Sequence, residues 1–600
     1  MAKWEQVGST FIGDNDSDYT GFTVSLTDNG NYLAIGSPQI EDLKGSGEGY
    51  VRVYEFIDDS SGGEWHQLGN DISVNGSDED DTGYSVSLIE SGYYGLLVGI
   101  TSPYKEDDDI PGEVHVYNYD VSSEIWNQFG NTIYNDAVGD GDDLESYSCV
   151  KLMSNSQYDS SYNLVLGIGV EQDEITDDDT GYVHIYYYDR ADGSWNPLGG
   201  NDNNLILGKS PDGYFGHSIS LINTTTVTRI AVGAPYAMDA NDDDETGAAY
   251  VYEFNEDDNS WNQVGSNIYG LNDSDETGWS VALSGSSANV LIIGEPNFDN
   301  AAGQVRVFEY IDASGDWYQK GNDISGEQPD FKAGYSVAIS DDGETISVGS
   351  IGYETDTSDN VGRVRVFDYD GSLNKWVQYG EDLVGFGVKN DKGFSIAMDS
   401  TGEYVAAGAP AQSGNSNDQI VGGYVMVHKR IPTASTCFTA DAIVSVDRGN
   451  IPICLVTTKD TICNEPIMGV SKAFYTQDRL IHVKKHAFGK YKPNKDITVA
   501  PYHKFMINGK LRMICNYVNN NTIYYKKYKD ELLYNIILKK NHTMKVNNMI
   551  VGTLEPQLLI SSLFNNTLTQ KEKKKVSRSI REHHRRVKKE NRKELKNFLV

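Results

Sequence analysis

Cys437 is the residue of this chain whose position most clearly suggests chemistry. It lies in the stretch Ser435-Thr436-Cys437-Phe438-Thr439, at a seam between two parts of the chain with different sequence character. A thiol at such a position can attack the preceding carbonyl, here that of Thr436, and convert an amide into a thioester. A single cysteine is also commonly no more than a small buried apolar residue. The choice between these two interpretations depends on the residues on either side of the seam.

The two sides of the seam differ strongly in charge. Residues 1–430 carry 18 Lys and Arg against 75 Asp and Glu, whereas residues 431–600 carry 31 against 13. Such an asymmetry indicates a domain boundary, and the acidic part should repel nucleic acid and anionic membranes. The five cysteines are few and odd in number, and their spacing fits neither a disulfide framework nor a zinc site.

The acidic part is repetitive. Each repeat has a marker of the pattern Trp-x-x-x-Gly. After the marker comes an acidic loop, and then three strand patterns, as in Gly83-Tyr84-Ser85-Val86, Val232-Gly233-Ala234-Pro235 and Gly303-Gln304-Val305-Arg306. The marker Trp-x-x-x-Gly recurs at Trp4, Trp65, Trp126, Trp195, Trp261, Trp317 and Trp376. Four short strands per repeat predict the blades of a β-propeller. Seven markers predict seven blades over residues 1–430.

The ends of the repeat region predict how the ring closes. The first repeat begins with its fourth strand, near Trp4, and the last has only three, at Phe394–Met398, Tyr404–Gly408 and Gly423–His428. We therefore expect the N-terminal strand to complete the last blade, which removes two exposed sheet edges. The aromatic residues are expected to pack within and between blades rather than to form a ligand cage.

These repeats resemble the FG-GAP repeats of integrin-α-type propellers over nearly all of residues 1–430. The resemblance implies a binding or display module for a protein or glycan ligand. The place of the family's calcium loop is too short here, as in Thr27-Asp28-Asn29-Gly30. Acidic loops elsewhere, at residues 14–18 and 272–276, could hold Ca²⁺, but spaced ligands with a fixed Gly are missing, so solvated turns are favoured. No other cofactor is expected.

Residues 437–556 resemble a Hint domain, the compact all-β module shared by Hedgehog C-terminal domains and inteins. The resemblance rests on three blocks that occur in the family's order. They are Cys437-Phe438-Thr439-Ala440-Asp441-Ala442-Ile443-Val444 with residues 448–462, the run 481–509 with Thr498-Val499-Ala500-Pro501-Tyr502-His503, and the closing hairpin at residues 534–551.

The Hint resemblance implies a set of site residues. Cys437 is the nucleophile, and His503 takes the place of the histidine that polarises or protonates the scissile amide. The family pattern is Thr-x-x-His, but Ala500 stands at the Thr position. Thr498, on the same face of a regular strand, is the candidate substitute. His542 either assists resolution of the thioester or orders the closing hairpin.

The remaining histidines and the end of the block set limits on the chemistry. His482 and His486 are expected at the surface among lysines. Inteins end with His-Asn, whereas the matching positions here hold Gly552-Thr553, so splicing is not expected. The predicted function is self-cleavage: an N–S acyl shift at Cys437 releases the propeller, and water, a thiol or an amine resolves the thioester. The alternative is a binding, surface or particle protein with an inactive Hint relic, which Ala500 supports.

Residues 431–436 are predicted to be a linker and residues 557–600 a basic helical tail. The tail is a solvated helix, a ligand of nucleic acid or another anionic partner, or a segment that docks on the acidic propeller. No secretory signal begins the chain, and no apolar run reaches the roughly 18 residues of a membrane span. These features favour a cytoplasmic or particle-associated protein.

Overall fold

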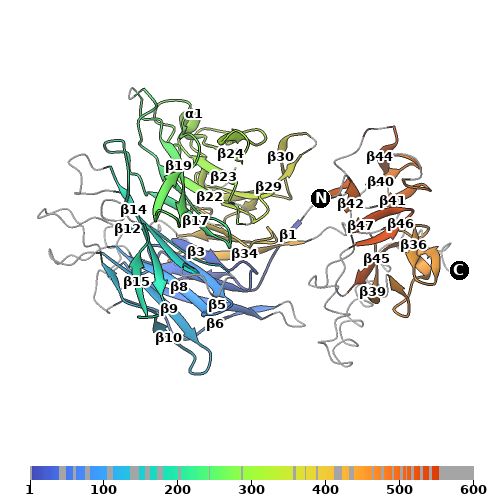
Figure 1. The fold of residues 1–600 in the computed structure, drawn as a ribbon, viewed down its shortest axis with the longest axis horizontal. Helices are drawn as coiled ribbons and strands as arrows, with labels where there is room; N and C mark the ends of the chain where they lie inside the picture. The colour runs from blue at the N-terminus through green and yellow to red at the C-terminus, as the bar shows by residue number, and fades with distance from the viewer. Residues whose placement is uncertain are drawn as a thin grey trace, which may run out of the picture. The chain divides into compact units, whose positions relative to one another are not determined.

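The chain was analysed as a computed structural model (Figure 1). It describes residues 3–15, 17–39, 49–57, 63–74, 81–103, 112–134, 147–155, 162–171, 180–199, 205–241, 244–285, 288–355, 360–371, 373–386, 390–410, 422–431, 438–462, 465–474, 479–488, 492–499, 504–507, 510–514, 519, 521–527, 532–538 and 543–552. The chain divides into two compact units. We call Lys3–Asp370 with Asn374–Ile431 the propeller unit, and the unit that holds Pro432–Val600 the C-terminal unit.

The described residues of the propeller unit form seven antiparallel sheets, and within each sheet four strands follow one another as neighbours. This layout is that of a β-propeller. The strands in sheet order are β1 (Lys3–Gln6), β34 (Tyr424–Ile431), β33 (Tyr404–Ala409), β32 (Ile396–Met398); β3 (Thr23–Leu26), β4 (Tyr32–Ser37), β5 (Tyr50–Ile57), β6 (Glu64–Gln67); β7 (Val86–Ser91), β8 (Gly95–Ser102), β9 (Glu113–Asp120), β10 (Ile125–Gln128); β12 (Tyr147–Ser154), β13 (Leu164–Val170), β14 (Tyr182–Asp189), β15 (Ser194–Pro197); β17 (Ser218–Asn223), β18 (Thr228–Ala234), β19 (Ala248–Asn255), β20 (Ser260–Gln263); β22 (Ser280–Leu283), β23 (Val290–Glu295), β24 (Gln304–Ile311), β25 (Asp316–Gln319); β27 (Ala333–Ile339), β28 (Thr345–Ser350), β29 (Arg363–Asp370), β30 (Lys375–Gln378).

Six of these sheets carry a short fifth strand that the four-strand pattern did not predict. In the sheet of β24, for example, the four residues of β25 pair with only half of the eight-residue β24. The chain then turns and pairs with the other half of β24. The fifth strand therefore occupies backbone groups that a four-residue outer strand leaves open. These strands are β2 (Phe11–Ile12), β11 (Ile133–Tyr134), β16 (Leu205–Leu207), β21 (Ile268–Tyr269), β26 (Ile324–Ser325) and β31 (Leu383–Val384).

The N-terminal strand completes the last sheet, which confirms the predicted closure. β1 pairs antiparallel with β34, so that Lys3 faces Ile431 and Gln6 faces His428. The first and last strands of the repeat region thus share one sheet, and β34 has no open edge on that side.

A circle of tryptophan hydrogen bonds joins the seven sheets. Each indole N–H donates to a backbone carbonyl three residues after the previous Trp, as Trp65 Nε1 does to Val7 O (3.0 Å) and Trp4 Nε1 to Tyr379 O (3.2 Å). The other five bonds are Trp126–Leu68, Trp195–Phe129, Trp261–Leu198, Trp317–Val264 and Trp376–Lys320. The prediction that these residues make contacts between repeats is confirmed.

The glycine of the Trp-x-x-x-Gly marker makes room for this contact. A Cβ on Gly8 would lie 2.6 Å from Cδ1 of Trp65, and one on Gly130 would lie 2.7 Å from Cδ1 of Trp195. Both glycines also have a positive φ, 70° and 83°. Since other residues rarely take that conformation, close approach and backbone angle both require glycine here.

A second set of contacts joins the sheets at their innermost strands. In six of the sheets an aromatic residue or His lies at or near the start of the inner strand. Neighbours in this series touch with ring centroids 4.6 to 5.4 Å apart, in the order Tyr84, Phe22, Phe394, Tyr335, Trp279, His217. The following serine donates to the next sheet, as Ser280 Oγ does to Gly334 O (2.8 Å) and Ser395 Oγ to Gly21 O (2.8 Å). The aromatic-Ser pattern therefore also serves sheet-to-sheet packing.

Lys392, which lies between β31 and β32, is unusual because it is a lysine in the core of the propeller unit. Its side chain is fully buried, and Nζ donates to Val384 O (3.4 Å). Among the described residues no carboxylate lies within ion-pair distance of it, and burial lowers the pKa of the Lys392 amine to about 7. His428 is buried nearby, and burial together with Lys392 lowers its pKa to about 3. Acid therefore places charge on groups that the fold keeps from water.

The C-terminal unit contains two antiparallel sheets around one apolar core. One sheet has the order β38 (Thr461–Ile462), β39 (Glu465–Phe474), β45 (Leu532–Leu538), β35 (Phe438–Thr439), β41 (Ile497–Val499), β40 (Arg479–Val483), β44 (Ile523–Lys527). The other has the order β37 (Gly449–Pro452), β36 (Ile443–Val446), β46 (Thr543–Val546), β47 (Met549–Gly552), β42 (Lys504–Ile507), β43 (Lys510–Met513).

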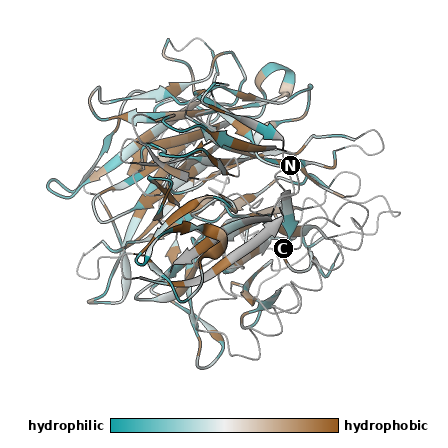
Figure 2. Cartoon of the chain, turned by 90° about the vertical axis from the view of Figure 1, so that its right-hand side faces the viewer, coloured by the Kyte–Doolittle hydropathy of each residue, from teal (hydrophilic) through white to brown (hydrophobic). Residues whose placement is uncertain are grey.

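The described residues are thus nearly all in strands and turns. Helical segments such as α1 (Phe298–Ala301) and the 3₁₀ turn η3 (Ile453–Leu455) are short. Brown apolar residues follow the strands, while the turns between them are mostly hydrophilic (Figure 2). The predicted linker, apart from Ile431, and the predicted basic tail lie outside the described residues.

Trp4→Ala should destabilise the propeller unit, because it removes an 8%-exposed side chain from the closing strand and leaves Tyr379 O without its donor. We expect a loss of about 3–5 kcal/mol in unfolding free energy. Tryptophan fluorescence during denaturant unfolding is the measurement, since every Trp of the chain precedes residue 431. Exposed Glu5 lies in the same strand, and Glu5→Ala should change stability by no more than about 0.5 kcal/mol. Equal stabilities of the two variants would contradict the closure.

Lys392→Met should stabilise the propeller unit. The native pKa of about 7 lies below the ordinary 10.5, so the cost of the buried amine is complete below about pH 7 and disappears as the pH rises past 10.5. We expect a gain of about 2 kcal/mol or more at pH 6 that shrinks steadily toward pH 10. Denaturant unfolding at several pH values measures it, with exposed Lys375→Met as the control. A gain that does not depend on pH would show that the amine is not the cause.

Candidate functional site

The structure describes only one of the residues predicted to take part in self-processing. Thr498 is described, in β41, whereas Cys437, His503 and His542 lie outside the described residues, as does Ala500. What can be built from the structure is therefore the framework around Thr498 and Phe438, the residue that follows Cys437 in the sequence.

Thr498 lies in the middle of the seven-stranded sheet of the C-terminal unit. Val499 pairs with Phe438 of β35 on one side, and Thr498 pairs with His482 of β40 on the other. Phe438, Val499 and Ile481 are fully buried in the core. Because side chains alternate along a strand, Thr498 and His482 share the opposite face of this sheet.

A chain of hydrogen bonds runs along that face. His482 Nδ1 lies 3.0 Å from Thr498 Oγ1, and His482 Nε2 lies 3.3 Å from Asp496 Oδ2. A carboxylate can only accept, so Nε2 carries the proton in the neutral ring, and Nδ1 must accept from the Thr498 hydroxyl. The arrangement fixes the orientation of the Thr498 hydroxyl through a histidine held by a carboxylate.

The carboxylate is itself held in its charged form. The backbone N–H of Lys485 donates to Asp496 Oδ1 (2.8 Å), and this bond, with that from His482, keeps the pKa of Asp496 below its ordinary value. The side chain of His482 is 16% exposed and that of Asp496 is 54% exposed. The network thus reaches solvent at Asp496 and is enclosed at Thr498, which is 8% exposed.

Asn547 connects this network to β36, the second strand after the seam. Its Nδ2 donates to Asp496 O (3.0 Å), and its Oδ1 accepts from Ile443 N (2.9 Å). Asn547 is buried and has a φ of 43° in the turn between β46 and β47. Asparagine is one of the few residues that tolerate this conformation. The closing hairpin therefore holds both β36 and the Asp496 loop.

The prediction that His482 lies at the surface is wrong. Its ring is mostly buried, bonds on both sides and packs 5.2 Å from the ring of Tyr524. His486, in contrast, is exposed as expected. The alternation Ile481-His482-Val483 could have indicated that His482 turns away from the core. The sequence offers no sign of the partner 16 residues away, because strand pairing sets that distance.

In each of the two acidic loops of the propeller unit, one carboxylate binds the backbone of its own loop. Asp18 Oδ2 accepts from Asp14 N (2.8 Å) and Asn15 N (3.0 Å), and Asp275 Oδ2 accepts from Asn272 N (2.8 Å). Both carboxylates are buried. Among the residues that the structure describes, no group of three or more His, Cys, Asp or Glu is placed to hold a metal ion.

A search for membrane spans among the described residues finds no helix with the length and apolar character to cross a bilayer.

Comparisons with known proteins name no family. No family model and no curated protein matches the sequence. Among solved structures, the periplasmic gluconolactonase PpgL of Pseudomonas aeruginosa is 15% identical, with 60% of this chain and 84% of that chain covered and a TM-score of 0.41. Sqt1 of Chaetomium thermophilum is 13% identical, with 71% and 100% covered and a TM-score of 0.41. A putative 6-phosphogluconolactonase of Bacteroides uniformis is 11% identical, with 61% and 85% covered and a TM-score of 0.39. Similarities this low say nothing about activity.

Asn547→Ala should loosen the closing hairpin and the Asp496 loop together. The change removes both side-chain hydrogen bonds, leaves Ile443 N–H without its acceptor and forces alanine into a left-handed conformation. We expect a cost of about 2–4 kcal/mol. Amide hydrogen exchange should speed up both in β46–β47 and around residues 494–496. Lys545→Ala, an exposed change in the same hairpin, should leave exchange unchanged. Faster exchange in the hairpin alone would contradict the coupling.

Proposed function

We propose that this chain is a self-processing protein whose C-terminal unit cleaves the bond between Thr436 and Cys437 and releases the propeller unit. The resemblance of residues 437–556 to Hint domains motivates the proposal. The observation that carries it is the Asp496–His482–Thr498 chain of hydrogen bonds, which orients a hydroxyl in β41, the strand that pairs with the residue after Cys437.

The strand register supports a role for this hydroxyl. Phe438 faces Val499 across the sheet, and its own side chain belongs to the core. Side chains alternate along a strand, so Thr498 and His482 lie on the face of the sheet opposite to the side chain of Phe438, and we propose that the reaction of Cys437 takes place on that face. Thr498 would then act where the family has the threonine that Ala500 replaces, with His482 as its positioning residue.

The proposed reaction has two steps. The Cys437 thiol gives its proton to water, and its sulfur attacks the carbonyl carbon of Thr436 and forms the C–S bond. The C–N bond breaks as His503 protonates the leaving nitrogen, which becomes the free amine of Cys437, and His503 then recovers a proton from water. Water, a thiol or an amine then attacks the thioester and expels the Cys437 thiolate. Since an amide is more stable than a thioester, the first step needs a strained or polarised amide and a second step that removes the product.

We further propose that the released part is one seven-bladed ring that binds a partner protein or glycan. The circle of seven indole hydrogen bonds supports the blade count, because it returns from Trp376 through Trp4 to the first repeat. Seven sheets in cyclic contact are what such a ring requires. The similarity of the repeats to FG-GAP repeats motivates the role in binding.

Intact mass spectrometry of the purified full chain, with and without added thiol or hydroxylamine, tests the processing proposal. We expect an acidic fragment that ends at Thr436 and a basic fragment that begins at Cys437, with added nucleophile increasing the yield. Cys437→Ala should abolish cleavage, and His503→Ala should slow it by roughly 10²-fold or more. Ala500→Thr should accelerate cleavage.

The two histidines of β40 and the following turn provide a matched pair. His482→Gln removes the link between Asp496 and Thr498 and should slow cleavage by roughly tenfold or more, whereas exposed His486→Gln should have no effect. If the wild-type chain remains at full length in strong thiol, or if Cys437→Ala cleaves as fast as wild type, the proposal fails and the inactive-relic alternative takes its place.

A further inference from the structure

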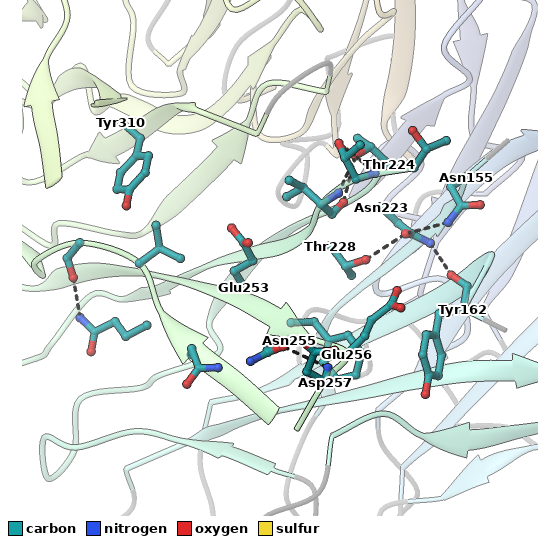
Figure 3. A pocket seen from close by; sticks show the side chains of 18 of the residues that line it. Asn155, Tyr162, Asn223, Thr224, Thr228, Glu253, Asn255, Glu256, Asp257 and Tyr310 are labelled. Carbon is teal, nitrogen blue, oxygen red and sulfur yellow. Dashed lines mark hydrogen bonds between the residues drawn. The ribbon is translucent and has the colours of Figure 1, made fainter. Parts of the chain in front are cut away.

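A polar hollow of about 770 Å³ opens in the propeller unit, at the turns between successive strands (Figure 3). It spans three consecutive sheets. Asn155 directly follows β12, Tyr162 lies just before β13, and Tyr310 is near the end of β24, while the middle sheet of β17–β20 supplies the floor. This volume lies within the roughly 300–1,000 Å³ typical of small-molecule sites.

The hollow has a local cause in one turn. In the sheets of β27 and β32, the turn between the first two strands contains a glycine that lies against the start of the second strand of the preceding sheet: a Cβ on Gly343 would meet Val290, and one on Gly402 would meet Thr345. The corresponding turn after β17 reads Asn223-Thr224-Thr225-Thr226-Val227-Thr228 and has no glycine. Thr224 closes it tightly, with Thr224 N donating to Val227 O (2.8 Å). A shorter turn without the abutting glycine leaves space beside it.

The walls are ordered by hydrogen bonds. Asn223, which is buried, accepts from Asn155 Nδ2 (3.2 Å) and Thr228 Oγ1 (3.1 Å) and donates to Tyr162 O (2.9 Å). The amide thus ties two sheets together on one side of the hollow (Figure 3). A preformed wall of this kind lowers the entropy cost of binding a ligand.

The charges on the walls exclude an anionic ligand. Among the described residues no Lys or Arg lines the hollow, whereas Glu253, Glu256 and Asp257 do. The charge of Glu253 is offset by Arg229, which does not line the hollow. Arg229 Nε donates to the Glu253 carboxylate (3.1 Å), and its guanidinium lies 5.3 Å from the centroid of the Tyr310 ring. Glu256 and Asp257 are exposed, so solvent screens their charge. They would contribute to ligand binding mainly as strong hydrogen-bond acceptors.

We propose that this hollow binds a short neutral oligosaccharide. Its walls offer Thr hydroxyls and Asn and Gln amides, which both donate and accept, beside carboxylates that accept. Sugar hydroxyls present the matching mixture. Tyr162 and Tyr310 lie at opposite ends of the hollow, where ring faces can pack on the apolar faces of sugar rings (Figure 3). The inference concerns the propeller unit and does not depend on self-cleavage.

The test is titration of the full chain with maltotriose, cellotriose, chitotriose and xylotriose, followed by calorimetry and ligand-observed NMR. We expect at least one of them to bind with a dissociation constant on the order of 1 mM or tighter, with little dependence on salt. Tyr310→Ala should weaken binding at least tenfold, and Glu256→Gln severalfold. Tyr318→Ala, an exposed tyrosine of the same sheet outside the hollow, is the control and should bind like wild type.

Tryptophan fluorescence unfolding checks that each variant still folds. Should Tyr310→Ala unfold, Glu256→Gln still decides, because its side chain is exposed and its loss should not disturb the fold. The assignment is overturned if none of the four sugars binds, or if the bound sugar is unaffected by both substitutions. Binding of spermine at the hollow in place of any sugar would make it a cation site and would also overturn the assignment.

Discussion

Each repeat of the propeller unit donates one indole N–H to the repeat before it, at N···O distances of 2.8 to 3.2 Å. A single bond of this type contributes about 1 kcal/mol net. Its structural effect is larger, because six of the seven indoles also pack on the marker glycine of the neighbouring sheet, as Trp65 does on Gly8. Removing one sheet would orphan a donor on one side and an acceptor on the other. The sheets therefore depend on one another around a closed circle.

This constraint leaves the loops free to carry other properties. The tryptophans, the marker glycines and the inner Ser-Gly contacts set the spacing of the sheets, and none of them lies in the acidic loops. Those loops can therefore vary in length and charge, provided that a residue such as Asp18 or Asp275 ties down the local backbone. The turn Thr224–Val227, which has no glycine, shows the effect, since a hollow lies beside it while the pairing of β17 with β18 stays regular.

Much of the propeller unit was predictable because its determinants are local and repeated. The Trp marker located each outer strand, and the missing fourth strand after His428 indicated that β1 pairs with β34. The fifth strands were missed because they depend on a length mismatch between two strands, which no residue type marks. In the C-terminal unit, the position of Thr498 in the sequence indicates a role in the site, whereas the sequence around its partner His482 predicts a surface residue. Lys484 and Lys485 follow His482 in the sequence, whereas its pairing with Thr498 of β41 places it in the sheet.

The direction of the closing ladder has a mechanical consequence. Lys3 faces Ile431 at one end of the β1–β34 pair, so the chain enters and leaves this ladder at the same end. A force that pulls residue 3 away from residue 431 loads the outermost backbone bonds first and opens the pairs one after another, like a zipper. Parallel strands held at opposite ends would have to break all their bonds at once. The propeller unit is thus most easily opened by tension between its own two ends. If the chain beyond Ile431 were separated from it, a force on that part of the chain could no longer reach β34.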